Sequence, residues 1–314
     1  MTPSKPFRRD TAMGIACLVA GLSVFSVQDL ILKLISGGYP LYEAMIVRSL
    51  TALPILGLFV HLNGGLRTLI SPDWGRMIWR GLIMFSAYAC YYLALASLPL
   101  ATTVALYFGA PLFITILSVT LLGDKVSARR WSAVLAGFAG VIIIVRPGSG
   151  LFDWAALLAV WSGLAYGLSM ISARRLGVGQ SAAVMAFYGN VVFLTCAGVM
   201  ALAFGSGAFA DEGHKSLGFL LRGWVTPTPH DFLLMAACGV IAATGLTLLT
   251  QAYRVAESSV VAPFEYTAMI WGVLYGWVFW HDWPDTTGWI GIGIIVASGL
   301  YLLYRERVEK RAAA

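Results

Sequence analysis

Charged residues are scarce in this chain of 314 residues. Asp, Glu, Lys and Arg together make up 11% of it, whereas a soluble globular domain contains about 25%. Hydrophobic residues reach 59%, and the mean hydropathy is +0.80. A chain of this composition cannot cover a soluble surface with polar groups, so the sequence predicts an integral membrane protein.

Cysteines and catalytic motifs are also sparse. The four cysteines lie far apart in apolar segments, which predicts buried free thiols. The chain contains no His-Glu-x-x-His, Gly-x-Ser-x-Gly, Walker or Cys-x-x-Cys motif. We therefore expect no catalytic residues, no metal site and no cofactor. Without an ATP-binding motif, any uphill transport would have to use a gradient.

Long hydrophobic runs fill most of the chain. A helix needs about 20 apolar residues to cross a membrane, and the chain divides into ten segments of roughly that length. The predicted spans are residues 11–35, 42–62, 75–97, 99–122, 129–146, 152–173, 181–204, 231–253, 258–280 and 286–304.

The basic residues are distributed unevenly among the connections between these spans. With the amino terminus in the cytoplasm, sixteen of the 21 basic residues fall on the cytoplasmic side, as the positive-inside rule requires. This distribution predicts a multi-pass protein of the bacterial cytoplasmic (inner) membrane with both termini in the cytoplasm. The net charge of +6 reflects topology, so it gives no support to nucleic-acid binding.

The chain also contains an internal repeat. Residues 92–146 align without a gap with residues 250–304, and an earlier pair of segments aligns Gly21 with Gly163. Each half then holds five predicted spans. Because five is an odd number, the second half must enter the membrane inverted relative to the first.

The predicted fold is therefore all-α, with ten transmembrane helices in two inverted five-helix repeats. The first repeat comprises residues 1–150, including the amino-terminal tail, and the second comprises residues 151–314, including the basic carboxyl-terminal tail. Inverted repeats are typical of secondary transporters that expose a site near the membrane midplane to each side in turn. A duplicated chain would also suit a channel or a membrane enzyme.

Motifs in both halves resemble the EamA-type transporters of the drug/metabolite transporter superfamily. The first half has Leu-Leu-Gly-Asp-Lys-Val at residues 121–126 and Val-Arg-Pro-Gly at 145–148, and the second has Ala-Pro-Phe-Glu-Tyr-Thr at 262–267 and His-Asp-Trp at 281–283. The family usually has Gly-Glu where this chain has Gly-Asp and His-Asp. The resemblance implies a ten-helix carrier of small metabolites, closest to amino-acid exporters and including those for aromatic amino acids.

Ionisable side chains inside membrane spans are costly to bury and are often functional. Arg48 lies about a third of the way into its span, and Glu265 lies seven residues past Ser258. Both could bind substrate, since an arginine fork suits a carboxylate, or bind helices together as polar glue. Asp29 and Lys33 stand four residues apart on one helical face, where they can form a charge pair or a gate. Glu43 begins its span and is interpreted as a solvated acid that favours the helix dipole.

Aromatic side chains within spans supply the rest of the predicted site, because a tyrosine hydroxyl there needs a polar partner away from lipid. One span also carries a serine-rich polar stripe, although serine mediates simple helix packing as well. The predicted substrate-binding residues are Glu265, Arg48, Tyr88, Tyr92, Tyr107, Trp161, Ser162, Tyr166, Ser169, Tyr188, Asn190, Tyr266 and Trp271.

Glycine and proline mark close packing and helix breaks. Gly137, Gly140 and Gly291 permit close backbone approach, so the fifth and tenth spans are predicted to pack together as a scaffold or a dimer face. Pro111 and Pro263 interrupt spans in both halves, and broken helices near the midplane indicate a substrate site. The two prolines are not equivalent in the repeat alignment.

These observations favour a secondary transporter that exports small amphipathic metabolites, with amino acids preferred and neutral or aromatic ones favoured. Two alternatives stay open: a carrier of a larger metabolite such as S-adenosylmethionine, a nucleotide sugar or a drug-like solute, and a cation-conducting pore. An intramembrane enzyme is disfavoured because no pair of nucleophile and base stands out. The expected partners are the small-molecule substrate and the lipid bilayer, without nucleic acid, in a monomer or homodimer.

Overall fold

All regular structure in the described part of the chain is helical. The computed structural model describes residues 11–123, 127–147, 152–176, 181–210, 213–255 and 262–313. Six helices in it are long and apolar enough to cross a membrane. The prediction of an all-α membrane protein is confirmed for these residues, whereas Asp124 to Val126 of the first family-like motif lie outside them.

The helices follow the predicted segments closely. Those of the first half are α1 (Thr11–Ile35), α2 (Leu41–Leu62), η1 (Leu66–Leu69), α3 (Trp74–Ser97), α4 (Leu100–Tyr107), α5 (Ala110–Leu117), η2 (Ser118–Leu122) and α6 (Ala128–Val145). Those of the second half are α7 (Ala155–Leu176), α8 (Ala182–Phe204), α9 (Lys215–Leu221), α10 (Pro229–Val255), η3 (Ala262–Tyr266), α12 (Thr267–Trp280) and α13 (Thr286–Ala313).

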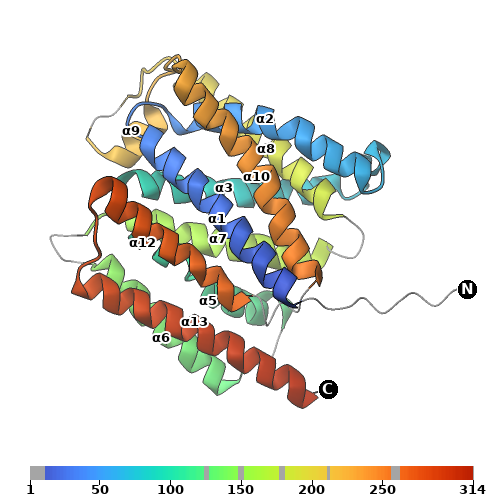
Figure 1. Ribbon diagram of the computed structural model, residues 1–314, viewed down its shortest axis with the longest axis vertical. Helices are drawn as coiled ribbons and strands as arrows, with labels where there is room; N and C mark the ends of the chain where they lie inside the picture. The colour runs from blue at the N-terminus through green and yellow to red at the C-terminus, as the bar shows by residue number, and fades with distance from the viewer. Residues whose placement is uncertain are drawn as a thin grey trace, which may run out of the picture.

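Helices from the two halves of the chain are interleaved. In Figure 1, α6 and α13 lie side by side at the lower end, α2, α8 and α10 lie at the upper end, and α1, α3 and α7 lie between them. The largest contacts pair α1 with α10, α3 with α7, α2 with α8, and α6 with α13. Each of these pairs joins one helix of the first half to one of the second, so neither half packs as a separate body.

Small residues bring α6 and α13 close together, as the sequence predicts. A Cβ atom added to Gly140 would lie 3.0 Å from the carbonyl oxygen of Gly291, and one added to Gly137 would lie 2.8 Å from the hydroxyl of Ser298. Any larger residue would push the helices apart. The predicted packing of the fifth and tenth segments is confirmed.

Two helical segments are broken near the centre of the molecule. The α4 helix ends at Tyr107, Phe108 and Gly109 form a turn, and α5 begins at Ala110. In the second half the 3-10 helix η3 ends at Tyr266, and the α-helix α12 begins at the next residue, Thr267. Pro111 is the second residue of α5, a position where a missing backbone N–H removes no helical hydrogen bond. Although the prolines are not equivalent, Phe108 and Tyr266 are equivalent in the gapless repeat alignment.

The connection between α8 and α10 folds over one end of the bundle. The Tyr42 hydroxyl donates to the Arg222 carbonyl at 2.7 Å, and the Arg222 guanidinium donates to the Ser36 carbonyl at 3.1 Å. The Val225 N–H donates to the Glu43 carboxylate at 3.2 Å. The interpretation of Glu43 as a solvated acid is therefore wrong, because this connection covers its side chain completely, leaving 0% of it exposed.

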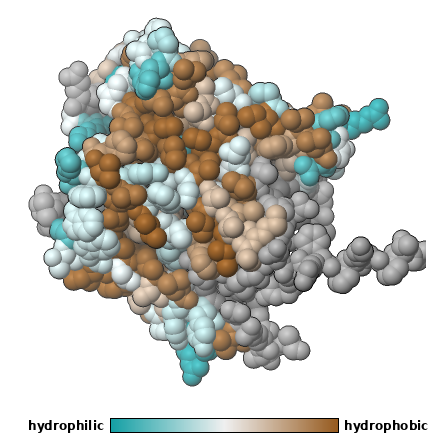
Figure 2. Space-filling view, viewed as in Figure 1, coloured by the Kyte–Doolittle hydropathy of each residue, from teal (hydrophilic) through white to brown (hydrophobic). Residues whose placement is uncertain are grey.

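Much of the surface is hydrophobic. Figure 2 shows brown, hydrophobic residues spread over most of the face in view. Large apolar side chains on several helices point outward, with Leu202 of α8 90% exposed and Leu135 of α6 and Leu233 of α10 each 67% exposed. A surface of this kind requires a lipid environment.

Candidate functional site

Three tyrosines of α3 begin an aromatic cluster at the centre of the molecule. Tyr88 and Tyr92 are four residues apart and share a helical face, with ring centroids 4.4 Å apart. Tyr91 meets Tyr92 edge to face at 5.0 Å. The rings fix one another in these positions because edge-to-face and offset contacts are the favoured aromatic geometries.

The broken segments extend this cluster to other helices. Tyr107 is the last residue of α4. Its ring centroid lies 5.3 Å from that of Tyr91 and 5.4 Å from that of Tyr166 of α7. Next to it, Phe108 lies 5.3 Å from Tyr266 of η3. Below, the tyrosine cluster means Tyr88, Tyr91, Tyr92, Tyr107, Tyr166 and Tyr266.

A hydrogen-bonded network joins α1 to the tyrosine cluster. The Gln28 amide donates to the Tyr92 hydroxyl at 2.8 Å, and that hydroxyl donates to one oxygen of Asp29 at 2.7 Å. The Tyr91 hydroxyl donates to the other Asp29 oxygen at 3.0 Å. Both carboxylate oxygens therefore accept a hydrogen bond from a tyrosine hydroxyl of α3, which fixes the orientation of the Asp29 side chain.

Arg48 of α2 joins this network from the opposite side. Its Nε donates to the Gln28 amide oxygen at 3.1 Å. Its guanidinium lies over the Tyr88 ring, 4.8 Å from the centroid, and 5.8 Å from the centroid of Phe193 on α8. Only 9% of Arg48 is exposed, so the charge is stabilised mainly by aromatic faces and one neutral amide.

Glu265 lies on the other side of the tyrosine cluster. Its carboxylate interacts electrostatically with the hydroxyls of Tyr107, Tyr166 and Tyr266. The buried Tyr266 hydroxyl has no hydrogen-bond partner among the described residues. It occupies the space where a side chain on Gly299 of α13 would begin, so only glycine fits there.

Three aromatic residues predicted for the site lie elsewhere. Trp161 is 49% exposed, and its indole donates to Ser86 at 2.8 Å. The Tyr188 hydroxyl donates to the Leu69 carbonyl at 2.7 Å and so anchors η1. Trp271 stacks on Tyr275 of its own helix at 5.6 Å. Depth in a span does not say which way a side chain faces, so these three residues stay predictions that the tyrosine cluster does not include.

Two of the predicted polar side chains of α7 and α8 donate hydrogen bonds to backbone carbonyls. The Ser162 hydroxyl donates to the Ala159 carbonyl at 2.7 Å, and the Asn190 amide donates to the Ser49 carbonyl of α2 at 2.9 Å. Ser169 is buried, and its hydroxyl has no partner among the described residues. Of these contacts, only the Asn190 bond joins two helices, α8 and α2.

The predicted pairing of Asp29 with Lys33 does not form. The Lys33 ammonium instead donates to the carbonyls of Leu95 and Leu98, at 2.8 and 2.5 Å, and lies 5.2 Å from a ring centroid of Trp280. The unpaired carbonyls at the end of α3 attract a cation more effectively than Asp29 does, since the Asp29 oxygens are already bonded to tyrosines.

Sequence reasoning missed Gln28, Tyr91, Phe108 and Phe193. Gln28 could have been found from its place beside Asp29, since an amide next to a mid-span aspartate is itself a polar signal. Tyr91 could have been found from its place between Tyr88 and Tyr92. Nothing in the sequence distinguishes Phe108 and Phe193 from lipid-facing phenylalanines.

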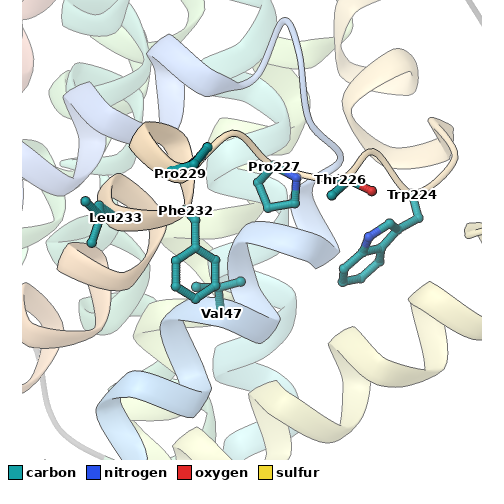
Figure 3. A pocket seen from close by; sticks show the side chains of 7 residues that line it. All are labelled: Val47, Trp224, Thr226, Pro227, Pro229, Phe232 and Leu233. Atoms are coloured by element: carbon teal, nitrogen blue, oxygen red, sulfur yellow. The ribbon is translucent and has the colours of Figure 1, made fainter.

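A separate pocket lies on the outside of the molecule. It has a volume of about 640 Å³ and is formed where the extended segment after α9 meets α2 and α10 (Figure 3). Its lining is apolar apart from Thr226 and includes Val47, Trp224, Phe232 and Leu233. A wall without charges offers little to orient a polar metabolite, so we place the candidate site at the tyrosine cluster.

No group of three or more potential metal ligands from His, Cys, Asp and Glu occurs within the described residues. The candidate site is therefore built from aromatic rings, two carboxylates, one guanidinium and one amide. Such a site can bind and orient an organic molecule by stacking and hydrogen bonding.

Comparisons with known proteins give the same class of protein. Residues 12–146 match the EamA-like transporter family. A riboflavin transporter of Rhizobium johnstonii is 30% identical over 220 residues, which cover 70% of this chain and 67% of that protein. An S-adenosylmethionine uptake transporter of Rickettsia prowazekii is 22% identical over 294 residues, covering 94% and 93%. A riboflavin transporter of Vibrio cholerae is 27% identical over 298 residues, covering 94% and 93%.

A solved structure shares the fold. One crystal structure aligns with a TM-score of 0.63 at 17% identity, covering 94% of this chain and 98% of the other. The relatives are named for riboflavin and S-adenosylmethionine. They do not support the expected closeness to aromatic amino-acid exporters.

Proposed function

The chain belongs to the EamA-like transporter family, and we propose that it carries a metabolite with a flat heteroaromatic ring across the membrane. It is a multi-pass membrane transporter and not an enzyme. The observation that carries the proposal is the tyrosine cluster, which brings rings from α3, α4, α7 and η3 together at the centre of the bundle.

The chemistry of the relatives' substrates supports this proposal. Riboflavin and S-adenosylmethionine differ in size and charge, but each carries a flat nitrogen-containing ring system. Offset stacking on tyrosine suits such rings, and the hydroxyls can bond to ring nitrogens. The polar groups of Arg48, Asp29 and Glu265 would then hold the rest of the molecule.

Export of aromatic amino acids, which the sequence favours, is the less supported candidate. An aromatic amino acid would also stack on tyrosine, so the preference rests on the relatives and their substrates. The relatives named for S-adenosylmethionine are uptake transporters. We therefore propose uptake of a larger metabolite, with amino-acid export as the alternative.

We propose that transport occurs by alternating access between two inverted repeats, residues 1–150 and 151–314. The helix pairs support this arrangement. In the repeat, α1 corresponds to α7 and α3 to α10; the α1–α10 contact therefore has its counterpart in the α3–α7 contact, and both are extensive. The equivalent residues Phe108 and Tyr266 touch each other at 5.3 Å, as residues next to a two-fold axis would.

Contacts between the halves support a closed outer end in this conformation. Lys33 of the first half binds the end of α3 and lies over Trp280 of the second. The Ser97 hydroxyl of the first half donates to Asp153 of the second at 2.6 Å, and His214, also of the second half, lies 3.1 Å from the same carboxylate. If the protein lies in a bacterial inner membrane with both termini on the cytoplasmic side, these groups would form the outer gate.

Uptake into proteoliposomes tests the proposed function. Labelled riboflavin and S-adenosylmethionine should each be offered to the purified protein, together with labelled tryptophan and phenylalanine. We expect saturable uptake of at least one of the two larger metabolites. Saturable transport of amino acids alone would contradict the proposal, and an ion current without any organic solute would favour a pore.

A matched pair of variants tests the role of the tyrosine cluster. Tyr107→Leu removes the ring that links Tyr91 to Tyr166, and loss of one stacking partner should weaken uptake about tenfold. Tyr304→Leu makes the same change on α13, where the side chain is 61% exposed, and should leave uptake unchanged. Equal behaviour of the two variants would place the ring-binding site elsewhere.

A further inference from the structure

We propose that Arg48 and Asp29 form a head-group subsite that selects zwitterionic substrates, with a carboxylate bound at Arg48 and a cationic group at Asp29. This proposal rests on the proposed function, because it assumes that a flat ring binds at the tyrosine cluster. It adds that the preferred substrate is a heteroaromatic metabolite with an amino-acid end. A neutral flavin would be a poor substrate.

Arg48 is a buried cation without an acidic partner among the described residues. Only 9% of the residue is exposed, its Nε is bonded to a neutral amide, and its guanidinium faces two aromatic rings. No carboxylate oxygen among the described residues lies within 4.0 Å of its nitrogens. An unpaired buried charge is costly, so this arrangement is explained best by an anion that arrives with the substrate.

The geometry of Arg48 suits a carboxylate. Gln28 occupies only Nε, and neither terminal nitrogen donates a hydrogen bond to a described residue. The two terminal NH₂ groups of a guanidinium can bind the two oxygens of a carboxylate side by side. The rings of Tyr88 and Phe193 limit the orientations of the guanidinium plane, so the subsite is formed before substrate binds.

Asp29 provides the opposite charge. Both of its oxygens accept hydrogen bonds from tyrosine hydroxyls, which orient the carboxylate but do not neutralise it. No basic nitrogen among the described residues lies within 4.0 Å of it, since Lys33 binds the end of α3 instead. A substrate ammonium or sulfonium group would supply the missing cation.

Neutral groups hold these two charges apart. Gln28 links Arg48 to Tyr92, and Tyr92 links Gln28 to Asp29, with donor–acceptor distances of 3.1, 2.8 and 2.7 Å along the chain. Without this relay, a buried guanidinium and a nearby carboxylate would be expected to pair directly. Fixed opposite charges separated by a neutral bridge are complementary to a zwitterion, whose own charges are also separated and opposite.

The subsite adjoins the tyrosine cluster, where the ring of the substrate is proposed to bind. Tyr92 belongs to both, because its hydroxyl bonds to Gln28 and Asp29 while its ring packs on Tyr88 and Tyr91. A substrate with an amino-acid end at Arg48 and Asp29 can therefore place its ring toward Tyr107. A ring compound without the amino-acid end would leave both charges unpaired, and sites of this kind discriminate strongly against such analogues.

Substrate analogues test the proposal on the unaltered protein. In proteoliposomes, S-adenosylmethionine and methylthioadenosine should compete with labelled S-adenosylmethionine. Both contain the adenine ring and ribose, but only the first has the amino-acid end and the sulfonium charge. We expect the half-competing concentration of methylthioadenosine to be at least about tenfold higher, the loss typical of a charge-assisted hydrogen bond. Equal competition, or uptake of riboflavin with none of S-adenosylmethionine, would overturn the zwitterion proposal while leaving a flat-ring carrier intact.

Variants of Arg48 separate head-group binding from general damage. Arg48→Gln should raise the half-competing concentration of S-adenosylmethionine at least about tenfold while changing that of methylthioadenosine less than about twofold, and Arg48→Lys should restore part of the difference. Arg76→Gln is the matched control, since Arg76 is a 74% exposed side chain paired with Asp73. Weakening of both solutes alike by Arg48→Gln would contradict the proposal. If neither riboflavin nor S-adenosylmethionine is taken up by the unaltered protein, the proposed function itself fails.

Discussion

Replacing Tyr92 by Phe tests the polar network most directly. The change removes one hydroxyl and keeps the ring that packs on Tyr88 and Tyr91 at 4.4 and 5.0 Å. The Gln28 amide, in a residue 2% exposed, loses its acceptor, and one oxygen of Asp29 loses its donor. A buried polar group without a partner costs about 1–3 kcal/mol, and more if charged, so the two losses together amount to about 2–6 kcal/mol.

Two measurements follow from this magnitude. The melting temperature of the detergent-solubilised protein should fall by several degrees. Competition by S-adenosylmethionine should weaken relative to methylthioadenosine, because the relay that separates Arg48 from Asp29 is broken at Tyr92. A variant with unchanged melting temperature and unchanged competition would refute the hydrogen-bonded network as described.

Tyr39→Phe is a matched control. The Tyr39 hydroxyl also bridges a donor and a carboxylate, since it accepts from the Thr228 N–H at 3.2 Å and donates to Asp231 at 2.6 Å. This bridge joins the α1–α2 connection to the start of α10, away from the tyrosine cluster. We expect Tyr39→Phe to lower the melting temperature and to leave the ratio of the two competitors unchanged.

Three further predictions concern a second carboxylate, the topology and the outer gate. Glu265→Gln should keep a monodisperse detergent peak and strongly reduce uptake; a loss of stability in proportion to uptake would instead indicate a packing role. In a background without the four native cysteines, cysteine at the exposed Ala208 should react with an impermeant thiol reagent outside intact cells, and cysteine at Ala128 should not. Although burial raises the pKa of Asp153, hydrogen bonds from Ser97, the Ala155 N–H and His214 outweigh it and hold that pKa below 3.8. The stabilisation relative to Asp153→Asn should therefore persist from neutral pH down to about pH 4 and decline only in stronger acid.

The helices could be predicted because membrane spans are a local property of the chain. A run of about 20 apolar residues predicts a span without reference to any neighbour, and the described helices follow those runs. The packing of α6 on α13 was also predictable, since glycine at Gly140 and Gly291 permits an approach that larger residues prevent. These inferences need only the identity and spacing of residues.

The composition of the candidate site could be predicted only in part. Depth in a span drew attention to Tyr88, Tyr107 and Trp161 alike, but the first two join the cluster and the indole of Trp161 faces the outside. The direction of a side chain depends on the rotation of its helix about its own axis, which is set by packing. The hydrophobic pattern of a nearly uniform apolar helix does not reveal that rotation.

The pairing of Asp29 with Lys33 was wrong for a related reason. Spacing of four residues places two side chains on one face, but it says nothing of competing partners from other helices. The carbonyls at the end of α3 take the ammonium, and the hydroxyls of Tyr91 and Tyr92 take the carboxylate. Spacing along one helix predicts an ion pair only where no residue of another helix forms a more favourable interaction with either side chain.

The two breaks near the centre show how a duplicated chain can produce an asymmetric site. Phe108 and Tyr266 occupy equivalent positions and touch, yet the residues before them differ: Tyr107 in the first half and Glu265 in the second. Arg48 likewise has Asn190 as its equivalent, and the one holds a charge against aromatic rings while the other bonds to backbone. A strictly symmetric site would present the same groups twice and could not tell one end of a substrate from the other. In the proposed site, divergence at these positions would therefore supply the polarity that orients an asymmetric molecule.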